Sequence, residues 1–183
     1  MSEKKRISFK KDSQGAIPQE AIILREWWKN LSRGRKAELR RCSSPEEVAV
    51  LGSFHELRFK LMDASLAPSL KRLALVAGLS AHVNEEPRES ISIGHQMAGH
   101  KQGSTMEVVS ELRFRRLLAI GNVVSSPNEN DYANFSANSQ ELYRMMIRII
   151  HMLNGECDLA SLADSVYWWN SKTKIELATD YFG

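Results

Sequence analysis

The sequence predicts an all-α protein, a helical bundle built from two small helical subdomains that pack together. Apolar residues recur at helical spacing from Pro18 almost to the C-terminus, and no segment shows the clear alternation of a half-buried strand. The chain has 183 residues, which suits one domain or two small ones. Its 43% hydrophobic and 26% charged residues are ordinary for a globular protein with a real core.

The order of polar and helical segments divides the chain into three parts. Residues 1–17 are polar and basic and are predicted to be a flexible tail. Residues 18–104 form the predicted N-terminal helical subdomain, and residues 105–183 form the C-terminal one. The boundary follows an irregular connection over 84–104, which contains Pro87 and three glycines.

The first helix is expected to run from about residue 18 to residue 31. Its apolar side chains fall on one side of a helical wheel, namely Ile23, Leu24, Trp27, Trp28 and Leu31. The tryptophan pairs at 27–28 and 168–169 are expected to pack mainly in the core. Adjacent helical positions diverge by roughly 100°, so one member of each pair is expected nearer the surface.

The helices that follow are marked by start signals and by apolar runs. A basic turn leads into a short helix that ends near Cys42. Ser44 then caps the next helix, Pro45 fits its first turn, and Glu47 completes a capping box. Further helices are expected over 54–62, 66–83 and 105–120. The one over 66–83 is apolar almost all round, which predicts a central place in the core.

The connection and the C-terminal half contain the remaining elements. One helical turn is expected near residues 93–98. Residues 122–137 are predicted to be a polar loop, which is long compared with ordinary loops. Helices resume over 138–153, where Asn154 and Gly155 signal a C-terminal stop, and again over 158–182.

The segment from Gln140 to Leu153 is the most informative about function. Apolar side chains cover nearly the whole cylinder and leave one narrow polar strip, which holds Glu141, Arg144, Arg148 and His151. Two arginines four residues apart repel each other by roughly a few tenths of a kcal/mol, and an external anion would relieve that cost. The alternative is that Glu141 pairs with Arg144 and that the strip simply faces solvent.

Two further clusters of basic residues are candidates for phosphate contact. In the segment 111–118, Arg113 and Arg116 share a side and Arg115 lies nearly opposite, and at least one of them is expected to pair with an acid. The other cluster lies on the turn and short helix near the N-terminus and consists of Arg33, Arg35, Lys36, Arg40 and Arg41. Guanidinium groups match phosphate geometry and bind it without reading sequence. A solvated basic edge is the alternative for this cluster.

No arrangement of residues predicts catalysis, a cofactor or a metal site. The five histidines lack carboxylate or cysteine partners at ligand spacing, and the six aspartates are spread singly along the chain. A phosphate-binding glycine loop and a nucleophile elbow are both missing. Cys42 and Cys157 are expected to be buried free thiols rather than a disulfide. We therefore predict a protein that is not an enzyme.

Charge and hydropathy indicate in which cellular compartment the protein is found and which classes of partner it binds. The net charge of +3 is too small to indicate nucleic acid by itself, so the distribution of the basic residues over the surface matters more. No apolar stretch approaches the ~20 residues of a membrane span. The basic N-terminus lacks the apolar run of a signal peptide. The sequence therefore predicts a cytoplasmic protein that does not bind membranes.

Taken in order, these segments resemble the CasB family, the small subunit of the CRISPR type I-E Cascade complex. The resemblance covers about residues 20–182, and it rests on the ordered set of short motifs rather than on any one of them. The motifs are Leu24-Arg25-Glu26-Trp27-Trp28-Lys29-Asn30-Leu31, Gly34, Ala37-Glu38-Leu39-Arg40-Arg41, Gly94, Ser110-Glu111-Leu112-Arg113-Phe114-Arg115-Arg116-Leu117-Leu118, Glu141-Leu142-Tyr143-Arg144, Asp158 to Trp169, and Ala178-Thr179-Asp180-Tyr181-Phe182.

The resemblance implies a non-catalytic subunit of two helical subdomains, present as two copies in Cascade. It implies contacts with the crRNA-bearing backbone subunits and the large subunit. It also implies basic faces that hold crRNA and target DNA and help stabilise the displaced strand of the R-loop in antiviral defence. The matching residues are Arg40, Arg41, Arg113, Arg116, Arg144 and Arg148, followed by the lesser candidates Arg33, Arg35 and Lys36.

Two interpretations from other classes remain beside this one. A helical protein–protein adaptor would use the basic residues only to balance internal acids. A compact helix-turn-helix regulator is disfavoured, because no short second helix presents small polar residues to base edges.

Overall fold

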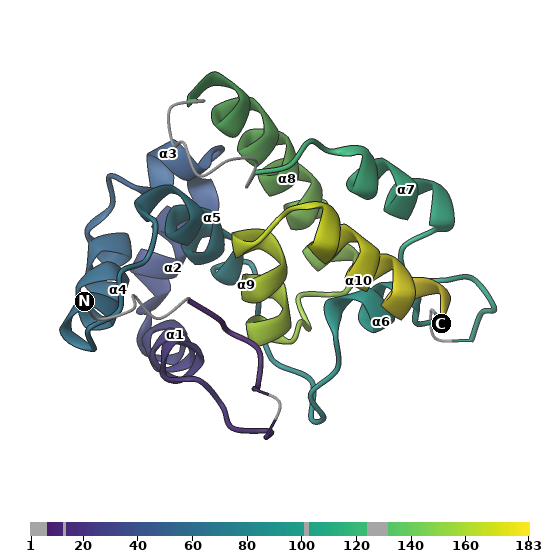
Figure 1. Cartoon of the computed structure of the whole chain (residues 1–183), viewed down its shortest axis with the longest axis horizontal. Helices are drawn as coiled ribbons and strands as arrows, with labels where there is room; N and C mark the ends of the chain where they lie inside the picture. Colours follow the sequence, from purple (N-terminus) through teal and green to yellow (C-terminus); the bar gives the residue numbers. More distant parts are fainter. Residues whose placement is uncertain (1–6, 13, 101–102, 124–131) are drawn as a thin grey trace. The chain divides into compact units, whose positions relative to one another are not determined.

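The computed structural model describes residues 7–12, 14–100, 103–123 and 132–183; for residues 132–136 it describes the backbone only. Within these residues the regular structure is helical, with two isolated β-bridges and no strand, which confirms the all-α prediction (Figure 1). The helices are α1 (Gln19–Asn30), α2 (Arg33–Arg41), α3 (Pro45–Val48), α4 (Gly52–Asp63), α5 (Leu70–Ser80), α6 (Ile93–Ala98), α7 (Glu111–Ala119), α8 (Tyr132–Met152), α9 (Leu159–Tyr167) and α10 (Ser171–Phe182).

Several helix ends differ from the predicted ones for local reasons. The helix expected over 66–83 is α5, and it starts only after Pro68, because a proline disfavours helical backbone at the residue before it. The segment expected over 158–182 forms two helices. Asn170 starts the second of them, with its side-chain oxygen accepting from the Thr173 amide at 3.1 Å.

The start of α8 corrects the predicted loop over 122–137. Helix α8 already begins at Tyr132, whereas the sequence predicts a helix only from residue 138. Ala133 and Ala137 are strong helix formers, and their propensity outweighs the polar residues beside them. The part of the predicted loop over 124–131 lies outside the described residues.

Tertiary contacts divide the chain into two units. The first unit comprises residues 1–81 and 159–167, and the second comprises 82–158 and 168–183. Helix α9 therefore belongs with the N-terminal helices, although it follows α8 in the sequence. This division differs from the predicted boundary between residues 104 and 105, because long-range packing rather than the longest loop sets it.

Helix α5 is the centre of the first unit. It contacts α2, α3, α4 and α9, and every residue from Leu73 to Ser80 is buried. The apolar character of this helix on all sides therefore does predict its central place. Trp27 on α1 is also buried, and its indole N–H donates to the Ser53 carbonyl oxygen at 2.9 Å, which joins α1 to the start of α4.

The N-terminal segment is part of the first unit rather than a flexible tail. Ile7 and Phe9 are buried in its core. The Phe9 amide donates to the Asp164 carboxylate on α9 at 2.9 Å, and the Ser8 amide donates to Glu20 at 2.9 Å. The prediction of a free tail over 1–17 misses this packing, and residues 1–6 and 13 lie outside the described part of the chain.

The second unit is organised by α6 and α10, which pack closely together (Figure 1). A Cβ at Gly94 on α6 would lie 2.6 Å from the Asp180 Cβ and 3.0 Å from the Leu177 carbonyl oxygen. The Phe114 ring of α7 stacks on Tyr181 of α10, with ring centroids 3.9 Å apart. Buried aromatic rings therefore join α7 to the same pair of helices.

Candidate functional site

The polar strip of α8 has the geometry that the sequence predicts. Helix α8 buries Leu142, Met146 and Ile149, which share the inner side of the wheel. Arg144 and Arg148 are exposed on the opposite side. They stand one turn apart, where side chains are neighbours on a helix surface. The strip therefore presents two guanidinium groups to solvent from a helix whose other sides are packed.

Neither arginine of the strip is neutralised within the described part of the chain. Glu141 is exposed as well, but among the described residues it forms no ion pair with Arg144. The alternative in which Glu141 balances Arg144 is therefore not adopted there. Two like charges at this spacing weaken an isolated helix by roughly a few tenths of a kcal/mol, a cost that a bound anion would remove.

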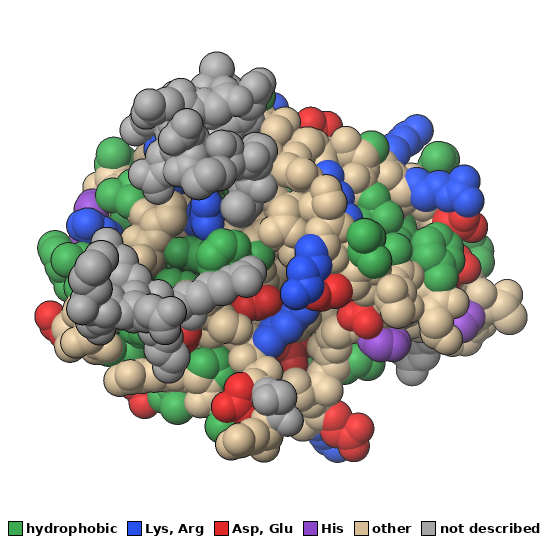
Figure 2. Space-filling model, in the orientation of Figure 1, with side chains coloured by type: hydrophobic (Ala, Val, Ile, Leu, Met, Phe, Trp, Pro, Cys, Tyr) green, Lys and Arg blue, Asp and Glu red, His purple; other side chains and the backbone are tan. Residues whose placement is uncertain are grey.

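Helix α7 presents its arginines on two flanks. Phe114 and Leu117 are buried, while Arg113 and Arg116 are exposed on one flank of the helix. Arg115, on the other flank, forms an ion pair with Glu111 at 2.5 Å, which confirms that at least one arginine of this segment pairs with an acid. Figure 2 shows Lys and Arg side chains standing out over α7 at the upper right.

The basic cluster near the N-terminus lies on α2. Ser32 caps this helix, with its hydroxyl accepting from the Arg35 amide at 3.3 Å. Only Leu39 of the helix is buried, so most of the basic side chains project from its exposed sides. Arg33 and Arg41 are exposed and form no ion pair among the described residues.

The other three basic residues of α2 have local partners. Arg35 forms an ion pair with Glu56 of α4 at 2.5 Å. The Lys36 ammonium lies 5.0 Å from the Trp28 ring centroid, and burial followed by the nearby charge of Arg40 lowers its pKa. The Arg40 guanidinium donates to the Ala81 carbonyl oxygen at 2.6 Å. These contacts orient the three side chains, so part of the basic character of α2 serves the fold.

The candidate residues are split between the two units. Arg113, Arg116, Arg144 and Arg148 lie in the second unit, while the α2 cluster lies in the first. The α7 and α8 candidates thus belong to one unit, and the α2 candidates belong to the other. Contact of any of these residues with a nucleic acid remains a prediction.

The tryptophan pairs and the cysteines are parts of the cores. Trp27 is 1% exposed and Trp169 is fully buried, while Trp168 is half-buried. Cys42 and Cys157 are buried free thiols, as predicted. Burial, followed by the charges of Glu156 and Asp158, raises the pKa of Cys157 to about 12. A thiol in this state is a poor nucleophile at neutral pH.

The described residues offer neither a metal-binding cluster nor a membrane-spanning helix. They contain no group of three or more His, Cys, Asp and Glu side chains close enough together to hold a metal ion. None of their helices is long and apolar enough to cross a membrane.

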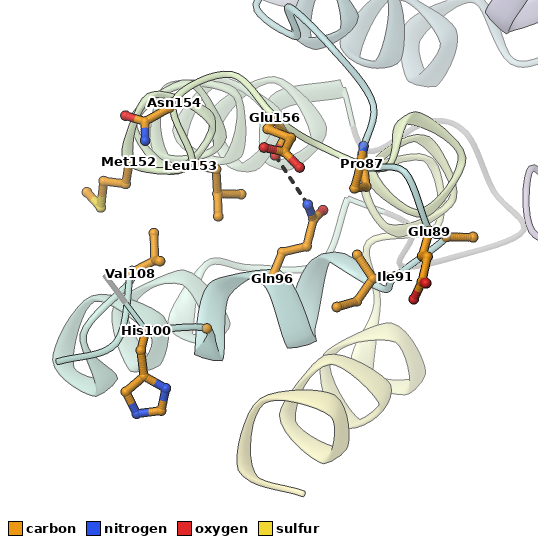
Figure 3. A pocket seen from close by; sticks show the side chains of 12 residues that line it. Pro87, Glu89, Ile91, Gln96, His100, Val108, Met152, Leu153, Asn154 and Glu156 are labelled. Atoms are coloured by element: carbon orange, nitrogen blue, oxygen red, sulfur yellow. Dashed lines mark hydrogen bonds between the residues drawn. The ribbon is translucent and has the colours of Figure 1, made fainter. Parts of the chain in front are cut away.

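The second unit also contains a feature that the sequence does not predict. A pocket opens between the connection after Asn84, the helix α6 and the end of α8 (Figure 3). The carboxylates around Pro87 looked like ordinary loop residues in the sequence. The only available signal was Ile91, an apolar residue among them, since the opposite wall comes from residues about 60 positions later.

Comparisons with known proteins agree with this fold and with the ordered motifs. The model of a family described as CRISPR-associated protein Cse2 matches residues 35–182. A search of curated proteins found no match. Among solved structures, the chain is similar to a chain of the crystal structure of E. coli Cascade bound to a PAM-containing dsDNA target. That pair is 18% identical with a TM-score of 0.55, over 90% of this chain and 96% of the other.

Proposed function

Because the chain belongs to the CRISPR-associated protein Cse2 family, also called CasB, we propose that it is the non-catalytic small subunit of a Cascade complex. In this role it holds the backbones of crRNA and target DNA and stabilises the displaced strand of the R-loop in antiviral defence. Its protein partners are the Cascade backbone subunits, the large subunit and a second copy of itself. The fold likeness to a chain of DNA-bound E. coli Cascade supports this assignment.

The pair of Arg144 and Arg148 is the observation that carries the nucleic-acid part of the proposal. Both guanidinium groups project from one packed helix, and neither has an ion-pair partner among the described residues. Guanidinium groups form charge-assisted hydrogen bonds with phosphate oxygens, often two at a time. Two such groups one helical turn apart suit successive phosphates of a strand, a contact that does not depend on base sequence.

Arg113 and Arg116 are further candidates in the same unit. They share the flank of α7 that lacks the Arg115–Glu111 ion pair. The α2 cluster supplies a second, weaker surface, because three of its five basic residues already have partners in the fold. We therefore expect the α7 and α8 arginines to contribute more to nucleic-acid affinity than the residues of α2.

Fluorescence anisotropy with labelled single-stranded and duplex DNA across a salt series tests this proposal. The wild-type protein is compared with Arg144→Glu/Arg148→Glu, which changes the net charge from +3 to −1, since each substitution changes it by −2. Affinity for single strands is expected to fall at least about tenfold in the variant. The logarithmic salt dependence is expected to lose about 1.4 of its slope, which is roughly 0.7 for each of two lost phosphate contacts.

A matched variant separates local contact from overall charge. Lys11→Glu/Lys29→Glu produces the same change in net charge at two exposed lysines of the first unit, and neither lysine forms an ion pair with the described residues. It is expected to bind almost as well as the wild type. Equal losses in both variants, or intact affinity in Arg144→Glu/Arg148→Glu, would contradict the proposal and favour the protein–protein adaptor.

A further inference from the structure

The second unit contains a pocket of about 700 Å³ that the nucleic-acid proposal does not use. Part of its lining is apolar: in Figure 3 Leu153 and Val108 point toward one another, and Ile91 lies on the opposite side from Met152. Cavities of this size with apolar walls and a few polar groups are typical binding sites.

Backbone and side-chain hydrogen bonds hold the walls of the pocket in place. The Asn84 amide donates to the Gly155 carbonyl oxygen at 2.8 Å, and the Cys157 amide donates to that of Glu85 at 3.1 Å. Gln96 adds a bridge from α6, since its amide group donates to the Glu156 carbonyl oxygen and accepts from the Asp158 amide. Three separate segments are therefore joined, and the pocket exists before anything binds.

The charge of the pocket is negative. Glu89 and Glu156 line it and are exposed, and the lining contains neither lysine nor arginine. His100 also lines it, but its ring points away from the cavity in Figure 3. A lining that combines apolar side chains with two exposed carboxylates disfavours phosphate and favours a cation that carries an apolar stem.

We propose that this pocket receives an arginine side chain from a basic segment of a protein partner. The arginine stem would lie against Ile91 and Leu153, and its guanidinium would pair with Glu89 or Glu156. Long basic side chains bury their methylene groups in this way while the charged head stays near water. The planar guanidinium also matches a carboxylate with two parallel hydrogen bonds, which a lysine cannot form.

This inference goes beyond the proposed function and does not depend on it. The nucleic-acid surface consists of arginines on α7 and α8, whereas the pocket presents carboxylates. A nucleic acid would be repelled there, so a protein is the macromolecule that the charge complementarity selects. The second unit would thus bind phosphate with one set of residues and a basic protein segment with another.

Peptide selection followed by direct binding tests the pocket while its natural partner is unidentified. A random dodecapeptide library displayed on phage is depleted on the full-length Glu89→Gln/Glu156→Gln variant and then selected on the wild-type protein. The enriched peptides are expected to carry an arginine beside an apolar residue. By fluorescence polarisation, a synthesised peptide is expected to bind the variant at least about tenfold more weakly, the effect of losing about 1.4 kcal/mol of charge-assisted pairing.

Two further variants and a competition experiment with spermidine decide between the possible outcomes. Glu26→Gln, at an exposed glutamate of α1, is the control and is expected to bind the peptide as the wild type does. Ile91→Ser removes one of the apolar lining residues and is expected to weaken binding as well. The proposal is overturned if selection enriches no basic peptides, if all variants bind equally, or if spermidine displaces the peptide, which would indicate a polyamine site instead.

Discussion

Asp164 on α9 holds the N-terminal segment in the first unit, and Asp164→Ala should release it. Its carboxylate accepts from the Phe9 amide at 2.9 Å and from the Ser8 hydroxyl at 3.4 Å. It also lies 4.0 Å from the Lys10 ammonium, at the limit of an ion pair. The three interactions fix the backbone over 8–10 while Phe9 is buried in the core. Their loss should leave the segment in an equilibrium between docked and detached forms.

The free-energy cost of Asp164→Ala follows mainly from the loss of one hydrogen bond. A hydrogen bond to a charged group contributes about 1.5–3 kcal/mol, and the Phe9 amide provides such a bond at good distance. The ion pair adds little, because the Lys10 side chain is 38% exposed and screened by water. A loss of about 2 kcal/mol raises the detached population by about thirtyfold.

Limited trypsin digestion under native conditions, followed by intact-mass spectrometry, measures that population. Cleavage after Lys10 or Lys11 requires the segment to leave the core, and its rate follows the detached fraction when docking is fast. The rate should increase about thirtyfold in Asp164→Ala. Phe9→Ala should increase the rate at least as much, because it removes a buried ring from the core.

The control is Asp63→Ala, which removes an exposed aspartate of the same unit that forms no ion pair with the described residues. It should be digested as slowly as the wild type. If Asp164→Ala is also cleaved at the wild-type rate, then burial of Ile7 and Phe9 holds the segment alone. The role assigned to the carboxylate would then be wrong.

Two further predictions concern the second unit. Gly94→Ala should lower the free energy of urea unfolding by about 1–3 kcal/mol, because its Cβ would overlap Asp180; Gly34→Ala, which has open space, should not lower it. Cys157 keeps its proton to a pKa of about 12 when folded but loses it near 9.0 when unfolded. Its contribution to stability is therefore complete below pH 9 and lost as pH rises toward 12. From pH 8 to pH 10 the wild type should lose about 1.4 kcal/mol more than Cys157→Ala, and equal losses would contradict this assignment.

The helical architecture could be predicted because its signals are local. The stripe of α1, the start signal at Ser44 and the apolar character of α5 each depend on a few neighbouring residues, and all three are found as expected. The prediction failed at the N-terminal segment for the opposite reason. Phe9 contacts Asp164 and Tyr167, more than 150 positions away, and no local pattern records such a contact.

The candidate site shows the same contrast. The strip of Arg144 and Arg148 could be derived from the helical wheel, because a helix that is apolar on its other sides must expose its remaining polar strip. The partner of Arg35 could not be derived in this way, because Glu56 belongs to another helix. The pocket beside Ile91 was missed too, since its walls come from distant parts of the chain.

By itself the sequence determined the helical class, the exposed arginine strips and the family, because periodicity, wheel position and ordered motifs are properties of the chain in one dimension. Only the tertiary structure decided that α9 joins the first unit, that Gly94 must be small, and which basic residues are already paired. These features depend on distances between residues far apart in the chain. Burial and long-range packing set those distances, and a single sequence does not record them.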